Sequence, residues 1–253
     1  MLRIVGLGIR GFQGIPLDAI SAIQNSDHVY LDSYTSVMDE TFVIGLNRKF
    51  SSIKIADRNS LEDDTAILDQ ASREDVAIVV VGDPLSATTH NQIRYDALRR
   101  GIPVEIIPAS SIITYAPAIA GLYPYRMGPP VSIPFTSEKF FPTSAYRKIR
   151  KNLEMDLHTL LLLDLREGRT MPLDEVSFTL REMEKREGGK LLGRMEVLVI
   201  SAAGSVEERI YRGNLKQVSK LGNVSPCSLI IPSKLSDQEK EFVEAFSHPI
   251  EGT

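Results

Sequence analysis

Short apolar runs alternate with amphipathic stretches along the first hundred residues. The run VAIVVVG at 76–82 is nearly continuous and rich in β-branched side chains, as expected of a strand that is covered on both faces. The same pattern predicts strands at 2–7, 28–32, 53–56, 76–82 and 103–108, and helices at 16–26, 39–50, 61–72 and 90–101. Strands that alternate with helices in this way predict a parallel sheet enclosed by helices.

The pattern changes near residue 109, where ASSIITYAPAIAGLYPY is small, apolar and uncharged. Such a stretch suits burial between two units better than a solvated surface. Beyond it we expect strands at 129–135, 158–165, 195–204 and 228–232, and helices at 142–156, 172–189 and 237–247. The sequence therefore predicts two α/β domains, 1–112 and 113–253, with a boundary near 110–115.

Composition narrows the class of protein. Among 253 residues, 43% are hydrophobic and 25% are charged, which is typical of a soluble globular protein. The net charge of −4 gives no general attraction to nucleic acid, and no run of 18 apolar residues indicates a membrane span. One cysteine and no signal-peptide pattern predict a cytoplasmic protein. The four histidines lack ligand spacing, so no metal site is predicted.

The segment GLGIRG at 6–11 has the Gly-x-Gly-x-x-Gly spacing of a dinucleotide-binding loop, and Asp32 lies at the expected distance beyond it. A helix that began at Gly8 would have to contain Gly11, Gly14 and Pro16, and proline alone costs about 3 kcal/mol in a helix interior. We therefore expect the helix to begin at Pro16 and a flexible loop to precede it. This makes an NAD-dependent oxidoreductase the weaker alternative, although a bare strand end still suits a nucleotide-like ligand.

Other strand ends also carry candidate chemistry. Asp83 follows the 76–82 run in VVVGDPLSATTH, and ligands of open α/β sheets bind beyond the carboxyl ends of strands. An isolated Gly-Asp-Pro is equally consistent with a strand-exit turn whose carboxylate bonds local backbone. PASSIITYAP at 108–117 follows the next strand in the same manner, and LLLLD (160–164) and ISAAGS (200–205) repeat the arrangement in the second half.

Five segments that occur in order along the whole chain together resemble the diphthine synthase family. They are GLG, GDPLSATTH, SSI, FPTSAY and DLHTLLLLDLRE. This family belongs to the tetrapyrrole-methylase-like class of S-adenosylmethionine-dependent methyltransferases. The resemblance implies an N-terminal parallel-sheet α/β domain, a C-terminal α+β domain, an active-site cleft between them and a homodimer. It also implies methylation of the amino group of a 3-amino-3-carboxypropyl-histidine in translation elongation factor 2, which yields diphthine. A methyltransferase of the same fold that acts on a tetrapyrrole or on ribosomal RNA is the close alternative.

The same resemblance implies which residues contact S-adenosylmethionine, or S-adenosylhomocysteine as product. They are Ile9, Asp83, Ser86, Ser111, Ile112, Leu163, Ala203 and Cys227. The family commonly has histidine where this chain has Cys227, which as a small apolar residue could simply pack. His90 and His158 are interpreted as capping or packing residues, and the basic helix 146–152 as a solvated face that could also meet a protein substrate. No catalytic base is identified.

Overall fold

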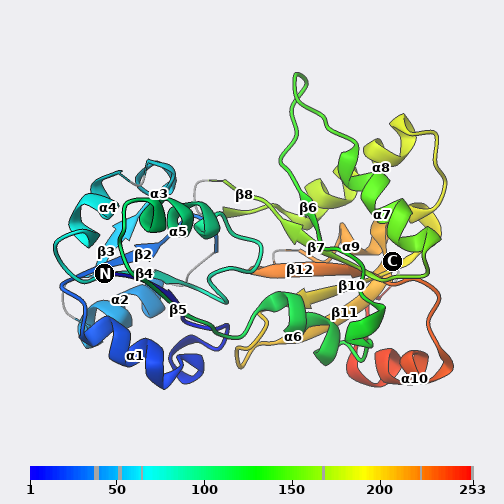
Figure 1. The fold of residues 1–253 in the computed structure, drawn as a ribbon. Coiled ribbons are helices and arrows are strands. Elements are labelled where there is room, and N and C mark those ends of the chain that lie inside the picture. Colours follow the sequence, from blue (N-terminus) through cyan, green and yellow to red (C-terminus); the bar gives the residue numbers. More distant parts are fainter. Residues whose placement is uncertain (37–39, 51–52, 64, 167–168, 223, 252–253) are drawn as a thin grey trace. The chain divides into compact units, whose positions relative to one another are not determined.

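The computed structural model describes residues 1–36, 40–50, 53–63, 65–166, 169–222 and 224–251. The chain divides into two compact units, Met1–Ile112 and Ile113–Thr253. Each is built around its own sheet (Figure 1). No helix in the described ranges is both long and apolar enough to span a membrane.

Unit 1 contains a five-stranded sheet whose paired strands all run parallel, in the order β3-β2-β4-β1-β5. Its strands are β1 (Leu2–Gly6), β2 (His28–Asp32), β3 (Ile53–Ala56), β4 (Val76–Val80) and β5 (Val104–Ile107). Its helices are the 3-10 helix η1 (Gly11–Gly14), α1 (Leu17–Gln24), α2 (Glu40–Lys49), α3 (Arg58–Glu62), α4 (Thr65–Ala71) and α5 (His90–Arg99).

Side chains on both faces of this sheet are buried, because successive residues of a strand point to opposite sides. On β4, Ala77 and Val79 pack with residues of α1 and α2. Val76, Ile78 and Val80 pack with residues of α3, α4 and α5 on the other face (Figure 1). This double covering confirms the parallel α/β sheet that the apolar runs predict.

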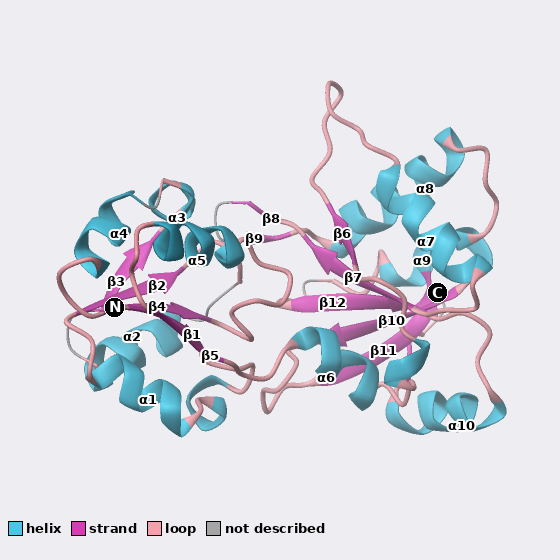
Figure 2. Cartoon of the chain, in the orientation of Figure 1, coloured by secondary structure: helices cyan, strands magenta, loops and turns pink. Residues whose placement is uncertain are grey.

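Unit 2 contains a six-stranded mixed sheet in the order β13-β11-β10-β12-β7-β6. Strands β6, β7, β12, β10 and β11 can be followed across it in Figure 2. Its strands are β6 (Val131–Ile133), β7 (Thr159–Leu163), β10 (Glu196–Ser201), β11 (Arg209–Asn214), β12 (Cys227–Ile231) and β13 (His248–Pro249), with a separate hairpin of β8 (Leu165–Arg166) and β9 (Arg169–Thr170). Its helices are α6 (Ile112–Ile119), η2 (Pro124–Arg126), α7 (Ser144–Glu154), α8 (Leu173–Arg186), η3 (Leu192–Arg194), α9 (Leu215–Val218) and α10 (Asp237–Phe246). Residues of α7, α8 and α9 pack with one face of the sheet.

Two local expectations are wrong, and two further elements lie where none is predicted. The segment predicted as a flexible loop before Pro16 contains the 3-10 helix η1, and the single helix predicted over 61–72 is replaced by α3 and α4. The small apolar stretch near 109–125 forms α6, whose interior Pro117 weakens the helical signal. Strand β11 was not predicted, because IYRGN mixes polar residues and glycine and lacks a clear alternation.

Candidate functional site

Three loops follow neighbouring strands at the same end of the unit 1 sheet. Strand β1 lies between β4 and β5, and all three run in the same direction, so the loops that follow them are adjacent. Backbone hydrogen bonds join the first two loops: Gly82 N donates to Gly8 O at 2.9 Å, and Gly8 N donates to Gly82 O at 3.2 Å. These loops lie at the carboxyl end of a parallel sheet, where ligands of such folds bind.

Glycine is required at the last residue of β1 and in the loop that follows it, because the three loops approach one another so closely. A Cβ atom on Gly6 would lie 2.7 Å from Ala109 Cβ and 2.8 Å from Gly82 O. One on Gly8, whose φ is +71°, would lie 2.8 Å from Gly14 O and 2.9 Å from Ser110 Oγ. The glycines therefore serve the packing of the loops on one another, in addition to any exposure of backbone to a ligand.

The carboxylate of Asp83 connects two of these loops. Its Oδ1 accepts hydrogen bonds from Leu85 N at 3.0 Å and Ser86 Oγ at 2.8 Å, which close the turn after β4. Its Oδ2 accepts from Ala109 N at 3.3 Å, across to the loop after β5. The structure is compatible with both interpretations of the Gly-Asp-Pro segment. Asp83 closes a strand-exit turn, and this turn lies at the carboxyl end of the sheet, where a ligand would bind.

The remaining unit 1 candidates lie on the same three loops. Ile9 is half-buried, its amide donates to Ser110 Oγ at 3.2 Å, and its Cγ2 lies close to Gly82. Ser86 and Ile112 are half-buried, and Ser111 is 8% exposed at the start of α6. The structure therefore gathers Ile9, Asp83, Ser86, Ser111 and Ile112, which are more than 100 residues apart at the extremes, on adjacent loops.

The three unit 2 candidates lie at one end of the other sheet. Cys227 begins β12 and is paired with Ser201 at the end of β10. The β12–β7 pairing joins Leu229 to Leu161, and the same register continued by two residues sets Leu163 opposite Cys227. Ala203 follows β10 by two residues, next to Ala202, whose amide donates to Pro226 O at 2.8 Å. Leu163, Ala203 and Cys227 thus share one sheet end.

Cys227 is half-buried and packs against the hydrophobic core of unit 2. Burial raises the pKa of its thiol to about 12, so the neutral form is present at physiological pH. The side chain therefore offers a small apolar surface rather than a reactive thiolate at this sheet end.

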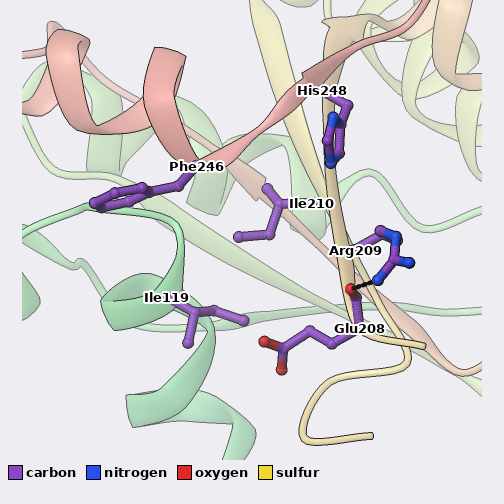
Figure 3. Close-up of a pocket in the computed structure, with 6 residues that line it drawn as sticks. All are labelled: Ile119, Glu208, Arg209, Ile210, Phe246 and His248. Atoms are coloured by element: carbon purple, nitrogen blue, oxygen red, sulfur yellow. Dashed lines mark hydrogen bonds between the residues drawn. The ribbon is translucent and has the colours of Figure 1, made fainter. Parts of the chain in front are cut away.

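A cavity of about 510 Å³ lies in unit 2 and is lined by none of the predicted contact residues. It is lined by Ile119, Glu208, Arg209, Ile210, Phe246 and His248 (Figure 3). Glu208 also accepts a hydrogen bond from Gly204 N at 2.6 Å, so its carboxylate stabilises the turn that carries Ala203. Sequence reasoning missed Glu208, since no local motif signals a bond that only the fold of the β10–β11 connection creates.

Asp32 cannot play the ribose-binding role that the Gly-x-Gly-x-x-Gly interpretation gives it. Its side chain is fully buried and accepts hydrogen bonds from Tyr34 N at 2.7 Å, Thr35 N at 3.1 Å and Thr35 Oγ1. In addition, α1 begins at Leu17 rather than at the glycines, so its N-terminus does not adjoin Gly8 in sequence. The dinucleotide interpretation lacks both of its physical requirements.

The two central histidines are enclosed. His158 is fully buried; its Nδ1 accepts from Ser233 N at 2.9 Å, so its Nε2 donates to Glu239 Oε1 at 3.0 Å. Burial lowers the pKa of His158, which keeps the ring neutral. His90 is also fully buried, with Nδ1 3.1 Å from Pro84 O. Neither ring is exposed to accept a proton from a substrate.

The basic helix predicted at 146–152 is part of α7. Tyr146, Ile149 and Asn152 are buried, whereas Arg147 and Lys148 are exposed. Arg147 forms an ion pair with Glu187 at 2.7 Å, so part of the positive charge is neutralised within unit 2. This agrees with the interpretation of a solvated face.

Three loops gathered at the carboxyl end of a parallel sheet form the arrangement in which α/β enzymes bind their ligands. The family model described as Tetrapyrrole (Corrin/Porphyrin) Methylases matches residues 1–219, and the chain belongs to that family.

Within this family, full-length relatives of the chain include a diphthine synthase and a protein named for diphthine methyl ester synthesis. A diphthine synthase of Thermoplasma acidophilum is 40% identical over 99% of this chain and 97% of its own. An Arabidopsis thaliana protein named "Probable diphthine methyl ester synthase" is 32% identical over 98% of this chain and 99% of its own. A crystal structure of a diphthine synthase matches with a TM-score of 0.87 and 26% identity, over 98% of this chain and 96% of that one. The chain therefore belongs to the diphthine synthases.

Proposed function

We propose that this protein transfers methyl groups from S-adenosylmethionine to the amino group of the 3-amino-3-carboxypropyl chain on a histidine of translation elongation factor 2, and so forms diphthine. The observation that carries the proposal is the 40% identity to a diphthine synthase over nearly the full length of both chains. Full-length similarity matters because the proposed contacts extend from Ile9 to Cys227.

The cofactor contacts are proposed at the two sheet ends described above. In unit 1 they are the loops that carry Ile9, Asp83 with Ser86, and Ser111 with Ile112; in unit 2 they are Leu163, Ala203 and Cys227. The chemistry of these groups fits such a ligand, because apolar side chains suit the adenine ring while loop backbone and hydroxyl groups suit its polar edges. Asp83 uses both oxygens to shape its loops, so we assign it mainly a positioning role.

S-adenosylmethionine supplies an activated methyl group on a sulfonium sulfur, so the reaction needs no nucleophile from the protein. The residues of this chain have two tasks: to bind the cofactor rigidly and to align the acceptor amine with the methyl–sulfur axis. Because His90 and His158 are buried and engaged, we propose that water takes the proton that the acceptor ammonium releases.

The test is a methyl-transfer assay with labelled S-adenosylmethionine and elongation factor 2 that carries the unmethylated intermediate. Mass spectrometry of the modified peptide counts the methyl groups, and mild alkali removes a methyl ester but leaves N-methyl groups. We expect alkali-stable label on the histidine-derived chain. Label on a tetrapyrrole or on ribosomal RNA instead would refute the proposal, as would tight NADH binding without binding of S-adenosylhomocysteine.

Asp83→Asn tests whether the hydrogen bonds of the Asp83 carboxylate support cofactor binding. The amide nitrogen that replaces one carboxylate oxygen cannot accept hydrogen bonds, so at least one link of Asp83 is lost. We expect S-adenosylmethionine affinity to fall roughly tenfold, which corresponds to about one hydrogen bond to a charged group. Asp69→Asn is the control, since Asp69 is exposed on α4, away from the three loops that carry the proposed contacts. We also propose a homodimer, which light scattering of the purified protein tests.

A further inference from the structure

The loop after β2 lies along the loop after β4, which carries two proposed cofactor contacts. Ser36 Oγ donates to Val81 O at 3.5 Å, at the start of the β4 loop. Tyr34 Oη lies 3.3 Å from Thr89 Oγ1, at its far end. In the interior, Asp32 at the end of β2 and His90 at the start of α5, which flank the two loops, lie next to each other.

His90 reaches back from the first residue of α5 to the middle of the β4 loop. Its Nδ1 lies 3.1 Å from Pro84 O, and because a carbonyl oxygen can only accept, Nδ1 is the donor. Thr88 Oγ1 donates to the same oxygen at 2.6 Å. Pro84 directly follows Asp83 and precedes Ser86 by two residues, so two side chains hold the peptide between the proposed contacts.

The other ring nitrogen of His90 faces a buried carboxylate. Nε2 lies 3.4 Å from Asp32 Oδ2 and has no hydrogen-bond partner among the described residues. Because Nδ1 is already a donor, this contact attracts the carboxylate only when Nε2 carries a proton as well, that is, in the imidazolium form. Burial by itself would raise the pKa of Asp32, but the imidazole of His90 and the donors of Thr35 and Tyr34 outweigh it and lower that pKa, so the carboxylate stays ionised. Both residues are 0% exposed.

Capping does not explain the placement of His90. The N-cap of α5 is Thr89, which makes no side-chain capping bond, and the ring of His90 bonds the preceding loop instead. If His90 only filled space in the core, it would need neither the hydrogen bond from Nδ1 nor a carboxylate near Nε2. The polar contacts of the ring are aimed at the β4 loop on one side and at the end of β2 on the other.

We propose that His90, oriented by Asp32, is a positioning residue that sets the conformation of the β4 loop for S-adenosylmethionine. This inference rests on the proposed function, because it assigns the ligand of the same loop. The imidazole fixes Pro84 O and so holds Asp83 and Ser86 at the sheet edge. The role of Asp32 is thus to anchor a cofactor loop from the interior.

Two variants separate the donor from the bulk of the ring. His90→Leu keeps an apolar side chain of similar size but removes the donor to Pro84 O. His90→Asn supplies an amide nitrogen near the position of Nδ1 and so preserves that donor. His158→Leu is the control, because it removes an equally buried histidine at the start of β7, away from Leu163 at the end of that strand.

The measurements are S-adenosylmethionine affinity by calorimetry, thermal unfolding, steady-state methyl transfer and amide hydrogen exchange of residues 82–89 without ligand. We expect His90→Leu to weaken binding roughly tenfold, the equivalent of one lost hydrogen bond, and to raise KM for the cofactor more than it lowers kcat. Exchange across 82–89 should rise as well. His90→Asn should recover affinity to within about threefold, and His158→Leu should lower Tm without weakening binding.

Unchanged affinity and exchange in His90→Leu would overturn the inference, and so would an equal loss of affinity in His158→Leu, which would indicate a general effect of destabilisation. If the wild-type protein binds S-adenosylmethionine but does not modify elongation factor 2, the proposed acceptor is wrong while the binding series still tests His90. If the wild-type protein binds no S-adenosylmethionine, both proposals fail.

Discussion

Gly6→Ala tests whether close contact among the three loops builds the unit 1 site. The added methyl would lie 2.7 Å from Ala109 Cβ, 2.8 Å from Gly82 O and 2.9 Å from Pro84 Cδ, all well inside van der Waals contact. Two of these neighbours belong to the β4 loop and one to the β5 loop, so relief requires both loops to move outward. Overpacking of this kind costs about 1–3 kcal/mol, or roughly 2–4 °C in Tm for each kcal/mol in a chain of this length.

Two other glycines provide matched controls. Gly101 has a φ of +71° and open space around its Cβ position, so Gly101→Ala tests backbone strain alone, at about 1–2 kcal/mol. Gly193 has neither a positive φ nor a neighbour within 4 Å, and Gly193→Ala should change stability by less than about 0.5 kcal/mol.

The assay combines thermal unfolding with S-adenosylmethionine titration for the three variants. We expect Gly6→Ala to lose both stability and affinity, Gly101→Ala to lose stability but keep affinity, and Gly193→Ala to keep both. If Gly6→Ala is as stable as Gly193→Ala and binds the cofactor equally well, the close approach of the loops does not determine the site and the reasoning fails.

Two further predictions concern unit 2. Glu239 is fully buried, and although burial alone would raise its pKa, hydrogen bonds from Ser236, His158 and Tyr123 lower that pKa from 4.5 to about 2. Its folded-state pKa lies below the unfolded value, so the stabilisation, about 3 kcal/mol, is present above pH 4.5 and is lost as pH falls towards 2. Urea unfolding of Glu239→Gln should show a loss of this size at pH 7 that shrinks by pH 3, whereas a constant difference would contradict the assignment. For Cys227, the pKa of about 12 predicts alkylation by iodoacetamide at pH 7.5 roughly a thousandfold slower than for an ordinary thiol, and rapid labelling of the folded protein would show that the thiol is not buried.

Local patterns predict the regular elements of this protein well and its connections poorly. The runs around Val5 and Val79 are apolar on both faces, which depends on neighbouring residues alone, and the structure confirms strands there. The segment after Gly8 has no such periodicity, and the expected loop is the 3-10 helix η1. Similarly, Pro117 conceals α6, because the helix tolerates a proline that local propensity penalises.

The sequence by itself determined the alternation of strands and helices, the parallel character of the first sheet and, through GDPLSATTH and FPTSAY, the family to which the chain belongs. Only the tertiary structure decided what individual site residues do. Gly6 meets Ala109, and Asp32 meets His90, because the strand order β3-β2-β4-β1-β5 sets β1 between β4 and β5 and β2 beside β4. That order follows from the packing of helices on both faces of the whole sheet, which no local window of residues contains. For the same reason, the acid that matches a dinucleotide motif in sequence is a buried anchor in the folded protein.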